Sequence, residues 1–256
     1  MIQRSFIILP RIGQRTEQNL WQHGITDWDA FRARQRVPGV SGALKAKHDR
    51  LLCQAKEQLY AGNSGFFLPI LPRVESWRLY DFFKDETVYI DIETSFDGDI
   101  TVVGLFDGDG TKTMVKGINL DARKLKEYLA RFKLMVTFNG ASFDLPILNR
   151  YYPGCIPSVP HLDLRHACAR IGLHGGLKSI EKQVGIHRDD EVVNVVGSDA
   201  PMLWRYFKAT GDEHYLQLLV KYNDEDTVNL ERLAGYAVQR LETAAGLAGG
   251  SSAEKN

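Results

Sequence analysis

Residues 89–94 have the sequence Tyr-Ile-Asp-Ile-Glu-Thr, whose alternation predicts a β-strand with two acidic side chains on one face. Side chains two positions apart on a strand share a face, so Asp91 and Glu93 stand together and the two isoleucines face the opposite side. Adjacent carboxylates repel each other, and burying them without compensation is costly. A divalent cation would remove that conflict, because hard cations take carboxylate oxygens. A solvent-facing edge strand explains this hexapeptide equally well.

A further acid follows a short apolar strand expected at 134–138. The strand leads into the turn pair Asn139-Gly140, and Asp144 then falls in the first turn of a helix expected at 143–150. An acid in a first turn is favoured by the helix dipole, so simple capping would account for it. Asp144 also lies just past the C-terminal end of an interior strand, where α/β sheets usually place functional groups.

The last acid of interest lies on a long helix expected over 212–241. Tyr222 and Asp226 are four positions apart, so they are neighbours on one face of this helix. That face is also the apolar stripe of the helix, and Tyr222 taken alone is explained by filling the core. A carboxylate on a core-facing stripe needs a partner, which a metal or a basic residue could supply.

The remaining pattern predicts an α/β fold. Strands are expected at 100–106 and 113–115, joined by the hairpin signal Asp-Gly-Asp-Gly at 107–110. Further helices are expected at 16–23, 27–35, 43–60, 120–132, 162–171, 177–184 and 202–210. The order of these elements is strands first, then a helix–strand unit, then helices. This order indicates a mixed sheet of antiparallel and parallel strands, flanked by helices.

The chain divides into four expected parts. Residues 1–61 form a small all-helical module, and 62–84 form an apolar tether with several glycines and prolines. The main domain spans 85–242. A tail at 243–256, rich in Gly, Ser and Ala, is expected to be disordered.

Charge is balanced over the chain but unevenly placed. The 32 basic and 32 acidic residues cancel, which excludes a protein that coats nucleic acid through net charge alone. Residues 1–50 hold nine basic residues against four acids, whereas 81–110 hold nine acids against Lys84 alone. This asymmetry suits a polyanion-binding piece joined to a cation-binding site, although ordinary solvated faces explain the counts as well.

Other sequence features indicate the compartment. The three cysteines show no CxxC spacing, which argues against a disulfide framework and a zinc ribbon. No apolar run is long enough to cross a bilayer, and residues 1–10 are too polar for a signal peptide. We therefore expect a cytoplasmic protein with no membrane contact.

Three motifs in order resemble those of a known enzyme family. The stretches at 91–93, 138–144 and 222–226 are similar to the three exonuclease motifs of the DEDD superfamily, whose fold is ribonuclease H-like. The third motif of that family has either a His five residues before its Asp or a Tyr four before it. Tyr222 fits the tyrosine form, often written DEDDy. The whole arrangement, from about 77 to 241, is most similar to bacterial YprB-like ribonuclease H-like proteins.

The resemblance implies a metal-dependent 3′–5′ exonuclease that acts on DNA or RNA with a free 3′ end. In the implied two-metal mechanism, Asp91 bridges both ions, Glu93 and Asp226 complete one ligand shell, and Asp144 holds the other ion. Tyr222 orients the attacking water. An all-oxygen ligand set favours two Mg²⁺ or Mn²⁺ ions over zinc. Asn139, in the second motif, is expected to contact nucleic acid.

Two other functions remain open. A catalytically silent nucleic-acid-binding module on the same fold would keep the architecture without the reaction, although such a protein has no reason to keep a crowded carboxylate cluster. A proofreading domain would need a separate polymerase partner, because 256 residues leave no room for a polymerase. The sequence names no protein partner.

The N-terminal stretch at 9–16 resembles the hairpin of a helix-hairpin-helix motif. Such hairpins aim backbone N–H groups at a phosphate from a helix N-terminus, so Arg11, Gly13 and Arg15 are expected to bind nucleic acid. Arg11 replaces the first turn glycine of the motif, and Glu17 stands where a small residue is usual. The alternative is a small helical module whose tryptophans pack in its core.

Overall fold

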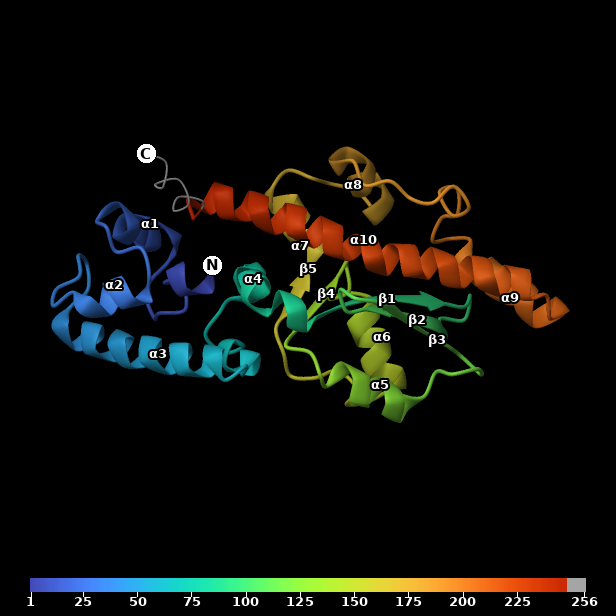
Figure 1. Cartoon of the computed structure of the whole chain (residues 1–256), viewed down its shortest axis with the longest axis horizontal. Coiled ribbons are helices and arrows are strands. Elements are labelled where there is room, and N and C mark those ends of the chain that lie inside the picture. The colour runs from blue at the N-terminus through green and yellow to red at the C-terminus, as the bar shows by residue number, and fades with distance from the viewer. Residues whose placement is uncertain (248–256) are drawn as a thin grey trace.

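Five strands form one mixed sheet, and this confirms the α/β fold class expected from the sequence (Figure 1). The computed structural model describes residues 1–247. The strands are β1 (Thr87–Thr94), β2 (Ile100–Phe106), β3 (Thr111–Val115), β4 (Leu134–Thr137) and β5 (His161–Asp163), in the spatial order β3-β2-β1-β4-β5. β1, β2 and β3 pair antiparallel, whereas β4 runs parallel to both β1 and β5. β1 is therefore the central strand of the sheet.

Helices cover both faces of this sheet, and three further helices precede it at the N-terminus. The α-helices are α1 (Gln14–Gln22), α2 (Trp28–Ala33), α3 (Gly42–Tyr60), α4 (Tyr80–Phe83), α5 (Ala122–Leu129), α6 (Asp144–Tyr151), α7 (Leu164–Arg170), α8 (Leu177–Val184), α9 (Ala200–Thr210) and α10 (Glu213–Ala245). In Figure 1, α10 crosses one face and α5 and α6 lie against the other. Among residues 1–247, no helix combines the length and the apolar character that crossing a membrane requires.

The alternation along β1 sorts its side chains between these two layers. Ile90 and Ile92 belong to the apolar cluster shared with α5 and α6. Asp91 and Glu93 alternate with them and face the layer that contains α10. The period of two therefore places both acids toward the long helix.

The predicted start of the helix expected at 162–171 is wrong. Residues 161–163 form the edge strand β5, whose Leu162 pairs with Val136 of β4, and α7 begins only at Leu164. A three-residue strand is too short to show a period of two, so helical spacing alone was visible in the sequence. The mistake matters because β5 ends at Asp163, which supports the site described below.

One glycine allows α10 to approach the sheet closely. Gly104 of β2 pairs with Asp91 of β1, and a Cβ added to Gly104 would lie 2.0 Å from Oδ1 of Asn223 on α10. No side chain other than hydrogen fits in that space. The close approach brings Asn223 directly to the carboxylate of Asp91.

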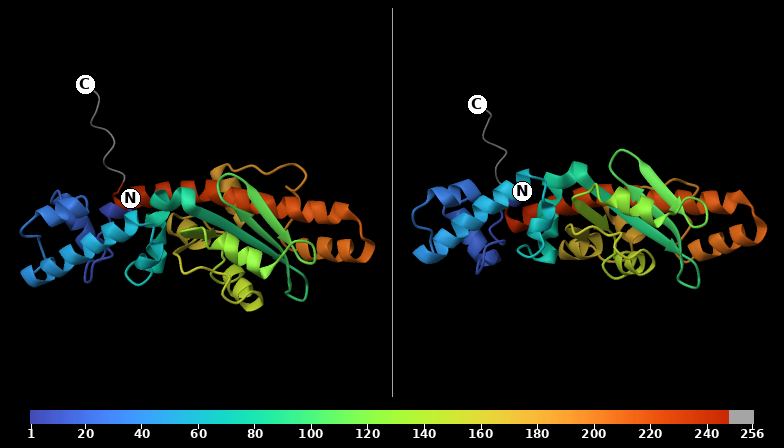
Figure 2. Two further views of the ribbon diagram at one scale, coloured as in Figure 1. Left: turned by 60° about the horizontal axis from the view of Figure 1, so that its bottom comes forward. Right: turned by 90° about the horizontal axis from the view of Figure 1, so that it is seen from below.

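The N-terminal helices lie at one end of an elongated molecule, and α10 runs from them along the sheet (Figure 2). The segment expected as a tether forms short helical turns, and its aromatic residues Phe67, Trp77 and Phe83 are buried. The division of the chain into parts stays a prediction. Of the expected tail, residues 243–245 belong to α10 and 248–256 lie outside the described residues.

A chain of ion pairs, two of them buried, joins α1 to α7. Glu17 of α1 and Arg78 are both 1% exposed, and Arg78 Nη2 lies 3.0 Å from Glu17 Oε2. Arg78 also binds Glu75 at 2.7 Å, and the other oxygen of Glu75 accepts from Arg170 of α7 at 3.0 Å. Removing one partner of such a buried pair costs folding stability, because the other charge is left uncompensated.

We predict that Gly104→Ala destabilises the protein by about 1–3 kcal/mol, because the added methyl group must push α10 away from β2. The free energy of unfolding, measured by urea denaturation, tests this. Gly110→Ala is the matched control, since Gly110 has open space around it and needs no left-handed backbone. Equal stability of the two variants would contradict the close-approach argument.

Candidate metal centre

Three carboxylates from two elements meet beside the central strand. Asp91 and Glu93 come from β1, and Asp226 comes from α10. One oxygen of each lies within 4.8 Å of the others. Glu93 and Asp226 are buried, whereas Asp91 is partly exposed. The structure thus brings together acids that are far apart in the chain, since Asp91 and Asp226 are separated by 135 positions.

Asp144 approaches the same strand from another side. It is the first residue of α6, is 3% exposed, and accepts the N–H of Ile92 on Oδ1 at 3.1 Å. The pairing of β4 with β1 ends at Tyr89, so Asp144 meets β1 beyond the last paired residue of β4. Asp144 lies outside the group of three, but its charge raises the pKa of both Asp91 and Glu93.

The loop between β4 and α6 is held by Asp163, a residue to which the sequence analysis gave no role. Asp163 Oδ1 accepts the N–H of Asn139 at 2.8 Å, and its Oδ2 accepts the N–H of Ala141 at 3.1 Å. Asn139 has a φ of +66°, a left-handed conformation that Asn tolerates better than most residues. Arg165 donates to the Asn139 side chain at 2.8 Å. These contacts hold the loop that leads to Asp144 at the start of α6.

Asn223 is a second residue that the sequence analysis missed. Its Nδ2 donates to Asp91 Oδ2 at 2.7 Å. Its position beside Tyr222 in the third motif was the only signal in the sequence, because its contact depends on how deeply α10 lies against β2. The amide orients the carboxylate of Asp91 without neutralising it.

Tyr222 lies among the acids and beside two cations. It is 5% exposed, and its hydroxyl hydrogen-bonds to Asp226. Lys178 Nζ lies 4.9 Å from the centre of its ring, and the guanidinium of Arg188 lies 5.8 Å from it. Arg188 also forms an ion pair with Asp226. No sequence signal pointed to Arg188, because it reaches the site from an irregular segment.

The acids carry raised pKa values. Burial, and then the charges of Asp226 and Glu93, hold the pKa of Asp91 well above its usual range. Burial raises the pKa of Glu93 in the same way, and it raises the pKa of Asp144 to about 7. Burial also raises the pKa of Tyr222, with the charge of Asp226 adding to the effect. The phenol is therefore neutral at physiological pH.

A cavity of about 250 Å³ opens beside these groups. Its lining includes the three acids, Tyr222, Phe143 at the rim, and Gly197 and Pro201 from the segments before and within α9. The oxygens fit a hard divalent ion, because they are close together, their carboxylates repel, and no sulfur or imidazole ligand stands among the group of three.

The predicted nucleic-acid contacts at the N-terminus lie on α1 and the turn before it. Gly13 is the N-cap of α1, and Arg11 has a φ of +66°, the left-handed conformation usual for a glycine. Arg11 and Arg15 are exposed. Glu17 points inward instead, since Oε1 accepts the N–H of Phe6 at 2.6 Å. Nucleic-acid binding by this module stays a prediction.

The chain matches a model of a known protein family. A family model described as the RNase_H superfamily matches residues 88–238, which is more than half of the chain. No curated protein matches the chain. The matched range begins in β1 and ends in α10, so it includes all the acids of the site.

We predict that the metal-free protein loses stability as the pH rises from about 4 to about 7. In that window the folded protein keeps a proton on Asp144 that the unfolded chain has released, so a rising pH favours unfolding. Asp144→Asn cannot ionise. In EDTA at pH 8, its free energy of unfolding is expected to exceed that of the wild type by about 4 kcal/mol, or roughly 8–16 °C in Tm. The difference is expected to vanish near pH 4.

Thermal unfolding of both proteins across this pH range measures the effect. Asp97→Asn is the control, because Asp97 is exposed in the turn between β1 and β2. Parallel pH curves for the wild type and Asp144→Asn would contradict the raised pKa of Asp144.

Proposed function

Because the chain belongs to the RNase H superfamily, we propose that it is a metal-dependent 3′–5′ exonuclease of DNA or RNA. The observation that carries the proposal is the set of three carboxylate oxygens within 4.8 Å of one another, beside the buried phenol of Tyr222. The motif order described from the sequence supports the same activity. The proposed substrate is a nucleic-acid strand with a free 3′ end.

The acids are proposed as ligands of two Mg²⁺ or Mn²⁺ ions. Asp91 would be shared between the ions, Glu93 and Asp226 would complete one site, and Asp144 would serve the other. When bound, such ions supply an activated water and stabilise the leaving oxygen of a phosphodiester. Asn223 supports this set by holding one oxygen of Asp91 at 2.7 Å, which leaves its other oxygen free.

Tyr222 is proposed to position the attacking water. Its raised pKa keeps the hydroxyl protonated, so Tyr222 acts as a hydrogen-bonding group and not as a base. The hydrogen bond to Asp226 fixes the direction of the hydroxyl at the cavity. The phenol and the acids therefore stand close enough to address the same reacting atoms.

The shape of the cavity favours a strand end over the middle of a duplex. Gly197 and Pro201 line it on the side of α9, and its volume is only about 250 Å³. Phe143 is 41% exposed at the rim and offers an aromatic face to a base. Asn139 lies on the loop that leads to Phe143 and is proposed to contact the strand.

A catalytically silent nucleic-acid-binding module is the second candidate. One observation favours it: Arg188 is paired with Asp226 and neutralises one of the four acids. The other acids argue against it, because their raised pKa values mark a cluster that costs stability without a ligand. Divalent ions should stabilise the exonuclease and leave a silent module unchanged.

We predict that the purified protein with Mg²⁺ or Mn²⁺ shortens 3′ ends in a panel of 5′-labelled DNA and RNA substrates, single and double stranded. Asp91→Ala should lower the rate by about 100-fold or more, because it removes the shared ligand. Tyr222→Phe should lower it by about tenfold or more, because the water loses its orienting group. Asp97→Ala, an exposed acid nearby, should leave the rate unchanged.

All substrates remaining intact with either ion would overturn the exonuclease proposal. Degradation that persists in Asp91→Ala would show that the activity comes from a contaminant or from another site.

We also predict that the N-terminal turn contributes to nucleic-acid binding but not to the reaction. Replacing both Arg11 and Arg15 with Gln should weaken binding and make it less sensitive to salt, because two phosphate contacts are lost. Gly13→Ala should also weaken binding, since its methyl group meets open space in the fold and crowds only a docked phosphate. The rate at saturating substrate should stay the same.

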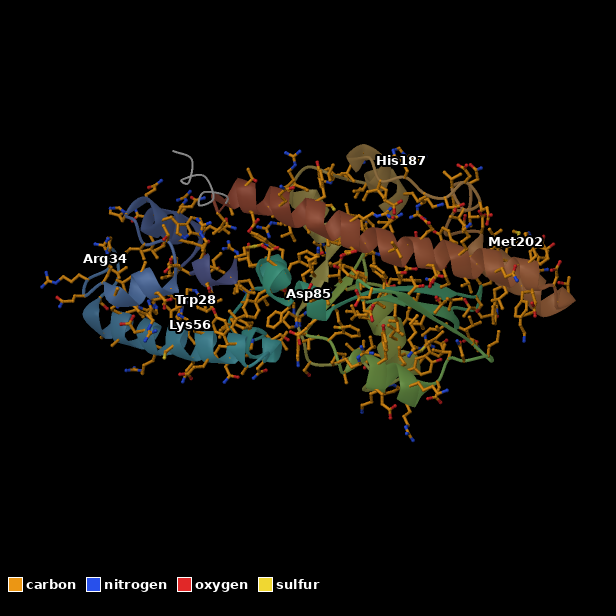
Figure 3. All side chains as sticks on the ribbon, viewed as in Figure 1. Trp28, Arg34, Lys56, Asp85, His187 and Met202 are labelled. Carbon is orange, nitrogen blue, oxygen red and sulfur yellow. The ribbon has the colours of Figure 1, made fainter. Side chains whose placement is uncertain are left out.

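Fluorescence anisotropy with labelled oligonucleotides at several salt concentrations measures this binding. Arg34→Gln with Arg36→Gln removes the same charge from the outer end of the module, where Figure 3 labels Arg34. Equal affinities for the two double variants would favour a purely structural N-terminal module.

A further inference from the structure

Arg188 is a buried cation within the acidic site. Its side chain is 5% exposed, and its guanidinium forms an ion pair with Asp226. Its Nε and Nη2 also lie 2.6 and 2.8 Å from the two oxygens of Glu181 on α8. Its third nitrogen, Nη1, is buried and has no hydrogen-bond partner within residues 1–247.

The segment at 185–199 carries Arg188 to the site. This segment links α8 to α9, and Figure 3 shows His187, the neighbour of Arg188, on the side of α10 away from the sheet. Gly197, near the end of the same segment, lines the acidic cavity together with Tyr222. The segment thus contributes both a wall of the cavity and a positive charge inside it.

The charge of Arg188 has opposite consequences in the two states of the site. Without metal, it offsets part of the repulsion that Asp226 feels from Asp91 and Glu93. A divalent ion on Asp226 would instead face a fixed positive charge in a buried region, where such repulsion is only weakly screened. Arg188 and the ion therefore contend for one carboxylate.

We propose that Arg188 is a built-in competitor for the divalent ion, which neutralises Asp226 in the metal-free protein and lowers the metal affinity of the site. The inference rests on the proposed function, in that it takes the acids to be metal ligands. Glu181 moderates the competition, because it is itself 1% exposed and binds the same guanidinium through both oxygens. Arg188 thus sets how much free metal the protein needs.

This arrangement gives Arg188 and Glu181 opposite effects although they form one ion pair. Removing the positive charge of Arg188 strengthens metal binding, because the competitor is gone. Removing the negative charge of Glu181 weakens it, because the whole charge of Arg188 then bears on Asp226. A pair that only held the segment in place would shift metal affinity in the same direction from either side.

The test is calorimetric titration of the metal-free, full-length protein with MnCl₂. Arg188→Gln is expected to bind Mn²⁺ about tenfold more tightly than the wild type, which corresponds to about 1.4 kcal/mol. Glu181→Gln is expected to bind it several-fold more weakly. Arg188→Lys keeps the charge and should stay within about threefold of the wild type. Arg170→Gln, from the ion pair with Glu75, is a matched control with unchanged affinity.

Thermal unfolding in EDTA and with added Mn²⁺ is a second, independent measurement of the competition. Arg188→Gln should lower the Tm in EDTA, since Asp226 loses its partner, and should show a larger rise in Tm on adding Mn²⁺ than the wild type. If Arg188→Gln weakens Mn²⁺ binding, or shifts it in the same direction as Glu181→Gln, the competitor role is wrong. If the wild type binds no Mn²⁺, or if Asp91→Ala binds Mn²⁺ as well as the wild type does, the proposed metal-dependent function falls as well.

Discussion

Repulsion among the three carboxylates that line one cavity, increased by the nearby charge of Asp144, is the constraint on which the rest of the site depends. Asp91 receives the amide of Asn223, Asp144 receives the N–H of Ile92, and Asp226 receives Arg188. None of these contacts removes the conflict, since the pKa values of the acids stay raised. Because β1 is the central strand of the sheet, its acids are not the outward residues of an edge strand. Such a cluster costs stability, which points to a ligand that offsets it.

The depth at which α10 meets the sheet makes this cluster possible. A helix resting on ordinary side chains of β2 would hold its own acid further from β1. Gly104 removes that layer of side chains at one point, and Asn223 occupies the space. One turn further along, Asp226 then comes within 4.8 Å of Asp91. The chemistry of the site thus depends on a missing side chain in a strand that contributes no ligand.

The sequence predicted those parts of the site whose spacing follows the period of an element. Asp91 and Glu93 share a face because strand side chains alternate, and Tyr222 and Asp226 share one because a helix turns every 3.6 residues. Three groups escaped prediction. Asp163 ends a strand too short to show a period, Asn223 depends on helix depth, and Arg188 lies on an irregular segment whose path only tertiary packing determines.

The same reasoning explains why Glu17 departs from the hairpin pattern. A small residue at that position would leave Arg78 buried without one of its two acids. Arg78 binds Glu75, and Glu75 binds Arg170 of α7, so this network ties α1 to the helix that follows Asp163. Glu17 therefore serves the junction between the N-terminal helices and the sheet. Because Glu17 and Arg78 are both buried in this junction, the orientation of α1 relative to α7 is fixed by charges that cannot separate without a large cost.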